Sequence, residues 1–208
     1  MINTVQAETL SLYDVKIKFG LRLAEEESFF SEWVGELPEV TEAEQQYLDR
    51  VKASYTNLAQ YPMLENTVKM VILSPLLDLA GFYQPPFRIT AEEPVQITAE
   101  DEGQIVRGRI DVLVLQQQLW VLAIESKSTK FAVLEAVPQA LAYMMANPNS
   151  ERSSFGLATN GTEFLFLKLT RQDTPRYALS NVFSLLNRGN QLYEVTRILK
   201  RFAGLIHP

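Results

Sequence analysis

The sequence predicts an α/β protein of α+β character, with a mixed central sheet flanked by helices. Three observations support this prediction. Alternating apolar runs between residues 87 and 127, and again between 155 and 182, are typical of strands. Segments with apolar residues at helical spacing precede, separate and follow these runs. This order of helices, strand meander, crossover helix, further strands and closing helix indicates a mixed sheet with helices on its faces.

The composition excludes several classes of function. A chain of 208 residues with 47% hydrophobic residues is long enough for one domain with a real core. It contains no cysteine, and its single histidine is His207, so thiolate metal sites, histidine zinc sites and Ser-His-Asp triads are disfavoured. It has no apolar run of the roughly 18 residues that a membrane helix needs, and no signal-peptide pattern. We therefore expect a cytoplasmic protein without a membrane partner.

Charge is distributed unevenly along the chain. Residues 1–102 contain 7 Lys and Arg against 18 Asp and Glu, whereas residues 103–208 contain 12 against 7. A locally positive field in the second half would suit a polyanionic substrate. The alternative is that the acidic half is simply a solvated helical layer.

The N-terminal 40 residues are expected to form a small helical extension. Residues 1–8 show no pattern and are expected to be unstructured. Ser11 can cap a short helix that runs to Phe19, and the pattern of residues 23–34 predicts a second short helix. We therefore divide the chain into an extension, residues 1–40, and a main domain, residues 41–208.

The main domain is expected to begin with two helices. Thr41 and Glu44 fit a capping box, which predicts a helix from Thr41 to about residue 60. A second helix is expected over about residues 63–79, and Pro75 should kink or split it. Later helices are expected near residues 138–147 and 191–206.

Strand signals lie between these helices. The expected strands are residues 87–99 with a break near Pro94, then 104–115, 119–127, 155–158, 163–169 and 177–182. The turn of the central hairpin falls on the glutamines at 116–118, and Asn160-Gly161 predicts another tight turn.

Three ionisable residues interrupt the apolar strands of the central hairpin: Asp111, Glu125 and Lys127. Each would be costly to bury without a partner. Glu125 and Lys127 are two residues apart and share one face of a strand, and a short turn brings Asp111 alongside. Two carboxylates and an ammonium group are the ingredients of a hydrolytic site that uses a divalent metal. The alternative is a surface salt bridge at the strand ends.

Two further segments carry candidate site residues. Gln139 and Tyr143 are four residues apart, so they share one face of the helix that follows Lys127. Glu65 lies in the first turn of its helix, where a favourable interaction with the helix dipole is the simpler explanation.

The spacing of Ile110-Asp111 and Glu125-Ser126-Lys127 resembles the PD-(D/E)xK nuclease superfamily. The segments LENTVKMVILSPLLDLAGF and LATNGTEFLFLKL, together with a Q-x-x-x-Y motif at Gln139 and Tyr143, resemble a narrower group. That group is the N-terminal nuclease domain of type I restriction enzyme R subunits, which is similar to RecB-like nucleases. The resemblance covers roughly residues 60–170.

The resemblance implies that residues 41–208 form a restriction-endonuclease-like domain that hydrolyses phosphodiester bonds in DNA. Asp111 and Glu125 would then bind Mg²⁺, with Mn²⁺ as an acceptable substitute, and Lys127 would be the catalytic lysine. Glu65 would be an additional acidic residue of the site. Gln139 and Tyr143 would support the site and position DNA.

Two departures from the family pattern qualify these expectations. Ile110 replaces the proline that often precedes the first aspartate. The 208 residues also contain no Walker A motif and no helicase motor, so we expect a stand-alone nuclease-like domain or a component that works with other chains. Expected partners are DNA and either separate restriction-system subunits or a second copy of the chain. The alternative function is a catalytically silent module for DNA binding or subunit assembly.

Overall fold

The computed structural model describes residues 4–99, 104–116 and 119–205. Within them, nine strands form one mixed sheet in the order β1-β4-β5-β6-β7-β8-β2, with β3 paired to β4 and β9 paired to β7. The strands are β1 (Thr4–Gln6), β2 (Arg22–Leu23), β3 (Phe87–Ala99), β4 (Gln104–Gln116), β5 (Leu119–Ser126), β6 (Ser154–Thr159), β7 (Glu163–Thr170), β8 (Arg176–Leu179) and β9 (Phe183–Ser184).

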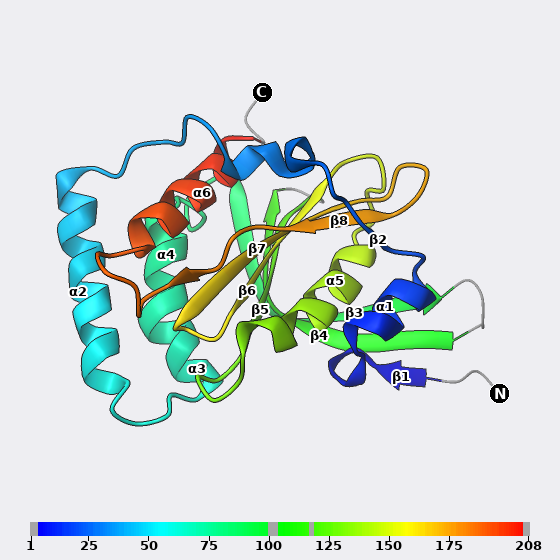
Figure 1. Cartoon of the computed structure of the whole chain (residues 1–208), viewed down its shortest axis with the longest axis horizontal. Coiled ribbons are helices and arrows are strands. Elements are labelled where there is room, and N and C mark those ends of the chain that lie inside the picture. The colour runs from blue at the N-terminus through cyan, green and yellow to red at the C-terminus, as the bar shows by residue number, and fades with distance from the viewer. Residues whose placement is uncertain (1–3, 100–103, 117–118, 206–208) are drawn as a thin grey trace.

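Helices cover both faces of this sheet, which confirms the predicted fold class. They are η1 (Ala7–Thr9), α1 (Leu12–Lys18), η2 (Glu27–Trp33), α2 (Glu42–Leu58), α3 (Glu65–Val68), η3 (Lys69–Leu73), α4 (Ser74–Leu79), η4 (Val133–Ala136), α5 (Val137–Met145) and α6 (Leu192–Gly204). Helices α2, α4 and α6 pack on one face, and α1 and α5 on the other (Figure 1). Each face therefore has its own apolar core, one around Phe166 and Phe202 and one around Leu141 and Leu165.

Strand β4 pairs with three neighbouring strands, one along its first edge and two along its second. One edge pairs with β3 along almost the whole strand. The other edge pairs with β1 at residues 105–107 and with β5 at residues 112–116. Residues 108–111 lie between these two ladders and pair with neither β1 nor β5. The sheet thus leaves a gap along one edge of β4, and the candidate site lies at this gap.

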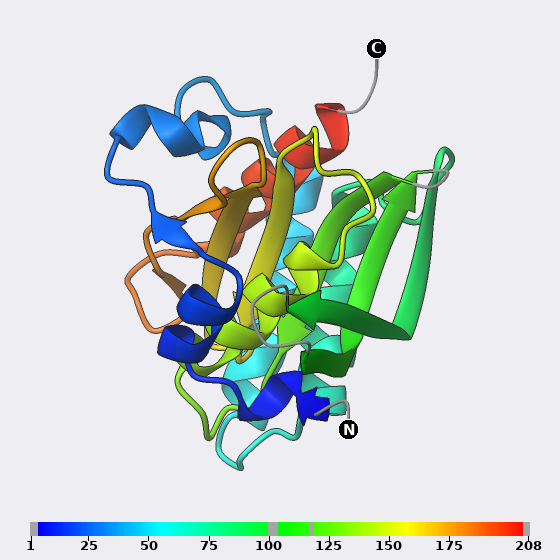
Figure 2. The same cartoon turned by 90° about the vertical axis from the view of Figure 1, so that its right-hand side faces the viewer.

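The N-terminal segment is more ordered than its sequence suggests, and the prediction that residues 1–8 are unstructured is wrong for the described residues 4–8. Strand β1 pairs in parallel with β4, and η1 follows it directly. The edge of β4 beyond β5 supplies backbone partners that local sequence patterns do not reveal. Figure 2 shows the blue N-terminal segment beside the long green ribbon of β3 and β4. The division at residue 40 stays a prediction, although β1 and β2 both join the main sheet.

The helical predictions hold with two adjustments. Both predicted caps are present, since the side chains of Ser11 and Thr41 accept hydrogen bonds from the backbone three residues later. The helix expected over residues 23–34 is a 3₁₀-helix, η2. The helix that contains Pro75 is continuous, but its middle segment η3 is a π-helix. Pro75 has no N–H to donate to the preceding turn, and a widened turn is one way in which a helix accommodates this loss.

One predicted turn is confirmed, whereas the break predicted near Pro94 is displaced. Gly161 has a φ of 82° in the Asn160-Gly161 turn between β6 and β7. Strand β3 continues past Pro94, and its irregularity lies instead at Glu92, which has a φ of 55°. Residues 117–118 of the predicted hairpin turn, and His207, lie outside the described residues. In the part of the chain that is described, no helix is both long and apolar enough to cross a bilayer.

Candidate active site

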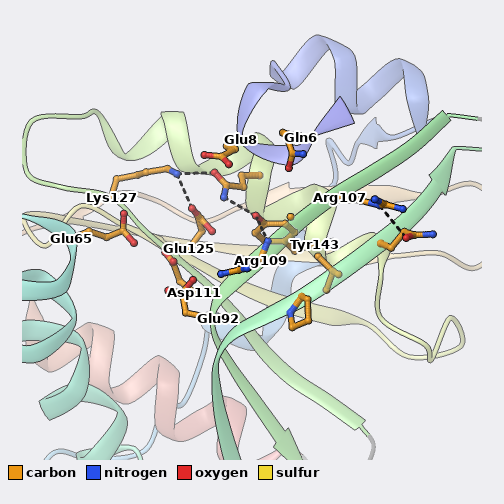
Figure 3. Close-up of a pocket in the computed structure, with 15 residues that line it drawn as sticks. Gln6, Glu8, Glu65, Glu92, Arg107, Arg109, Asp111, Glu125, Lys127 and Tyr143 are labelled. Carbon is orange, nitrogen blue, oxygen red and sulfur yellow. Dashed lines mark hydrogen bonds and ion pairs between the residues drawn. The ribbon is translucent and has the colours of Figure 1, made fainter. Parts of the chain in front are cut away.

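One pocket of about 610 Å³ is lined by all six predicted site residues (Figure 3). They come from four different elements or their ends: Glu65 from α3, Asp111 from β4, Glu125 and Lys127 from the end of β5, and Gln139 and Tyr143 from α5. The structure therefore brings together residues that span 79 positions of the sequence. The chemical roles of these residues stay predictions.

Asp111 lies where β5 ends and the gap along β4 begins. Its Oδ2 atom accepts a hydrogen bond of 2.7 Å from the backbone N–H of Ser126. Its Oδ1 atom lies 2.8 Å from the Nζ atom of Lys69. On the neighbouring strand β3, Glu92 falls between the paired residues Ala91 and Glu93 and adopts the left-handed conformation. Such a conformation costs roughly 1–2 kcal/mol for a residue other than glycine, so the backbone is locally strained beside Asp111.

Glu125 and Lys127 meet on one side of β5, as their spacing predicts. The Nζ atom of Lys127 lies 2.8 Å from Oε1 of Glu125 and 2.7 Å from Oε1 of Gln139. The other oxygen of Glu125, Oε2, is buried and has no hydrogen-bond partner. A buried carboxylate oxygen without a partner is energetically costly, so Oε2 of Glu125 is free to accept a ligand in the pocket.

The hydrogen bonds continue from Lys127 through α5 to the unpaired edge of β4. The Nε2 atom of Gln139 donates to the Tyr143 hydroxyl at 2.7 Å. The same hydroxyl accepts a bond of 3.2 Å from the backbone N–H of Arg109, within the gap between β1 and β5. Tyr143 can approach β4 this closely because residue 108 is glycine. A Cβ atom on Gly108 would lie 2.6 Å from the Tyr143 hydroxyl oxygen.

Lys69 is the centre of a second group of charges in the same region. Its Nζ atom lies 2.9 Å from Glu65, 3.4 Å from Glu92 and 2.8 Å from Asp111. Burial disfavours the charged form of Lys69, but its hydrogen bonds to Asp111 and Glu65 outweigh this effect and raise its pKa. Lys69 therefore remains an ammonium ion and offsets the negative charge on that side of the pocket.

Burial changes the acidity of the two central carboxyl groups. It raises the pKa of Glu125 to about 8, and the nearby charge of Asp111 adds to this effect. Burial also raises the pKa of Asp111 to about 6, although Lys69 and the Ser126 N–H oppose the increase. Two carboxyl groups with raised pKa values in one pocket are a pattern typical of functional sites.

Comparison with known proteins identifies the family. The family model of the type I restriction enzyme R protein N terminus (HSDR_N) matches residues 25–175. The chain belongs to this family. One similar solved structure is a fragment of a putative HsdR subunit of a type I restriction enzyme from Vibrio vulnificus YJ016. It has a TM-score of 0.42 and 20% sequence identity, and the alignment covers 69% of this chain and 26% of that chain. No curated protein was found to match.

The resemblance expected from the sequence is thus confirmed, and the protein contains a nuclease-like domain of the type I restriction R family. The family match begins at residue 25 and ends at residue 175. It therefore includes the segments that carry all six predicted site residues, from Glu65 to Tyr143.

The donor atoms in this HSDR_N domain fit a hard divalent cation. Asp111 and Glu125 offer carboxylate oxygens, and Oε2 of Glu125 is buried without a partner. Among the described residues, no three acidic, histidine or cysteine side chains form a metal-binding cluster. Mg²⁺ is commonly held by one or two carboxylates, with water and substrate phosphate completing its shell. Two carboxylates are therefore a sufficient protein contribution.

Sequence reasoning missed three residues that shape the HSDR_N site. Lys69 lies four residues after Glu65, and an acidic–basic pair at this helical spacing could have indicated a contact. Gly108 is an isolated glycine in a strand, which is a signal for close approach of another group. Arg109 alternates with Asp111 along β4, and the same pocket contains both.

Proposed function

We propose that this protein is a Mg²⁺-dependent DNA endonuclease that hydrolyses phosphodiester bonds, with Mn²⁺ as an acceptable substitute. The observation that carries the proposal is the buried, unpartnered Oε2 of Glu125 in the same pocket as Asp111 and Lys127. Membership of the R-protein N-terminal family supports the same function.

In this proposal each side chain has a distinct task. Asp111 and Glu125 would hold the ion, which when bound would neutralise charge on a phosphate and lower the pKa of a coordinated water. Lys127 is fixed between Glu125 and Gln139, so its ammonium group can orient the attacking water and stabilise charge on the phosphate. Glu65 would add negative charge at the edge of the site.

Gln139 and Tyr143 would act by holding other groups of the site in place. The amide of Gln139 joins the lysine to the tyrosine, and the tyrosine is anchored to the backbone of Arg109. This chain of hydrogen bonds connects α5 to both strands that carry the carboxylates. In this proposal Gln139 and Tyr143 would position DNA through the side-chain atoms that line the pocket.

A plasmid-cleavage assay tests the proposal. Supercoiled DNA should be nicked or linearised in Mg²⁺ or Mn²⁺ and remain intact in EDTA. Asp111→Asn should reduce the cleavage rate by about 100-fold or more, as expected for loss of a principal electrostatic group. Asp173→Asn is the matched control, because Asp173 is exposed and asparagine tolerates its left-handed conformation.

The assay also separates this function from the alternative, a catalytically silent module for DNA binding or subunit assembly. We propose DNA as the substrate and, as further partners, separate restriction-system subunits or a second copy of the chain. The catalytic proposal fails if the wild-type protein and Asp111→Asn are equally inert with each metal and with added subunits.

A further inference from the structure

We propose that Arg107 and Arg109 form a track that binds the sugar-phosphate backbone of a nucleic-acid strand beside the scissile phosphate. The inference rests on the proposed function, because it assumes that a phosphate occupies the pocket next to Asp111 and Glu125. It extends that function by assigning the direction in which the strand leaves the site, namely along β4 toward β1.

The position of the two arginines supports this direction. Arg107, Arg109 and Asp111 occupy alternate positions of β4, and all three line the same pocket. Alternate residues on an antiparallel strand are about 6.8 Å apart, a spacing of the same order as that between successive phosphates in an extended nucleic-acid strand. In Figure 3, Arg109 lies between Tyr143 and Asp111, and Arg107 lies further along the strand.

The backbone holds both arginines firmly. Arg107 pairs with Gln6 of β1 on one side and with Gln96 of β3 on the other. The backbone N–H of Arg109 is bound by the Tyr143 hydroxyl. Binding a phosphate would therefore require ordering of the two side chains but not of the backbone that carries them, which reduces the entropic cost of binding.

The guanidinium groups are available to a ligand. Both side chains are exposed, and within the described residues that of Arg109 makes no hydrogen bond or ion pair. Arg107 uses only its Nε atom, which donates to Oε1 of Gln96 at 3.2 Å. A free guanidinium presents a fork of donors that matches the oxygens of a phosphate. The cross-strand bond of Arg107 to Gln96 leaves its two terminal nitrogens for a ligand.

Two carboxylates outside the predicted catalytic set line the same pocket and must be counted against an anionic ligand. Glu92 on β3 lies 3.4 Å from Lys69, which offsets part of its charge. Glu8 on η1 is exposed and lines the pocket from the N-terminal side. Glu65, Asp111 and Glu125 of the proposed catalytic set also line this pocket. Removal of the Glu8 carboxylate should therefore strengthen binding, whereas removal of either arginine should weaken it.

Fluorescence anisotropy with a labelled DNA duplex, and with a single strand of the same length, tests the track. Binding is measured in EDTA, so that no cleavage occurs, over a series of salt concentrations. Arg109→Gln and Arg107→Gln should each raise Kd about 3- to 10-fold, and each should reduce the duplex salt-dependence slope by about 0.9 for the lost phosphate contact. Glu8→Gln should lower Kd.

Arg201→Gln is the matched control, because Arg201 is also exposed but lies on α6, outside this pocket. Thermal unfolding should show that all four variants remain folded, since each changes an exposed side chain. The track is refuted if Arg107→Gln and Arg109→Gln bind DNA with the affinity and salt slope of Arg201→Gln. That result could coexist with metal-dependent cleavage by the wild type, and a track without cleavage would refute only the catalytic proposal.

Discussion

The Nζ atom of Lys69 lies 2.8 Å from Oδ1 of Asp111, the carboxylate proposed to bind the metal. The same ammonium group contacts Glu65 and Glu92, so it serves as a cation among three carboxylates. A divalent ion at Asp111 would be repelled by this charge and would compete for the same oxygen. We therefore expect Lys69 to stabilise the metal-free site and to oppose metal binding.

Replacement of Lys69 should strengthen metal binding. In Lys69→Met we expect Kd for Mn²⁺ to fall by about 10-fold, or about 1.4 kcal/mol, as measured by titration calorimetry. The metal-free variant should melt at a lower temperature than the wild type, because Asp111 loses its partner. Added Mn²⁺ should raise the melting temperature of the variant by more than it raises that of the wild type. Lys200→Met is the control, since Lys200 pairs with Glu44 on other helices. Weaker or unchanged Mn²⁺ binding would show instead that Lys69 positions Asp111 for the metal.

Gly108 determines whether Tyr143 can reach the edge of β4. The added Cβ of Gly108→Ala would lie 2.6 Å from the tyrosine hydroxyl and 2.7 Å from its ring carbon Cε1. We expect a loss of stability of about 1–3 kcal/mol, typical of overpacking, and a lower cleavage rate because the Gln139 hydrogen bond is displaced. Urea unfolding and plasmid cleavage measure these effects.

Gly204→Ala provides the control for this substitution, because a Cβ at Gly204 would meet no atom within 4 Å. It should leave cleavage unchanged and leave stability unchanged or slightly increased, since alanine is the better helix former. Equal stability of the two alanine variants would mean that Tyr143 shifts without cost and that Gly108 is not needed for its position.

The sequence predicted the elements that have strong local signals. The N-cap at Ser11, the capping box at Thr41, the Asn160-Gly161 turn and the alternating pattern of the central hairpin each depend on residues close together in the chain. The grouping of Asp111, Glu125 and Lys127 was predictable for the same reason, because a hairpin makes them neighbours. Gln139 and Tyr143 were placed by family resemblance, and the structure shows their physical link to Lys127.

The features that were missed depend on contacts between distant segments. Strand β1 forms because β4 extends beyond β5 and leaves a free edge, and no pattern within residues 4–6 reveals this. The contact of Lys69 with Asp111 joins residues 42 positions apart. The π-helical segment before Pro75 is different because it is local: one helix adapts to a missing N–H, for which the sequence predicted only a kink or a break.

Gln139 should affect the rate of cleavage more than substrate binding. Gln139→Leu removes the acceptor that holds Lys127 and the donor that holds Tyr143. We expect kcat to fall by about 10- to 100-fold, comparable to loss of a positioned proton-transfer or charge-stabilising group, with a smaller change in KM. Gln139→Glu should retain more activity, because it keeps an acceptor for Lys127 and the tyrosine hydroxyl can donate to it. Equal losses in both variants would argue against this positioning role. Gln172→Leu, at an exposed position, is the control.

Glu125 should make stability depend on pH when no metal is bound. Burial raises its pKa from the usual 4.5 to about 8 in the folded protein. Between these pH values the unfolded chain releases the proton while the folded protein retains it, so the free energy of unfolding of the wild type decreases as pH rises. Below about pH 4.5 the group is protonated in both states and this effect disappears. Glu125→Gln removes the ionisation but preserves an oxygen that can accept from Lys127.

We therefore expect Glu125→Gln to be more stable than the wild type at pH 8 by roughly 1–3 kcal/mol, since each tenfold change in proton affinity corresponds to about 1.4 kcal/mol. The difference should shrink toward pH 5. Urea unfolding in EDTA at several pH values measures it, with Glu151→Gln as a control at an exposed position. Parallel stability curves for the wild type and Glu125→Gln would mean that water or Lys127 keeps the Glu125 carboxylate ionised at neutral pH. Saturating Mn²⁺ should reverse the order at pH 8, because the proposed metal site stabilises the wild type and is weakened in the variant.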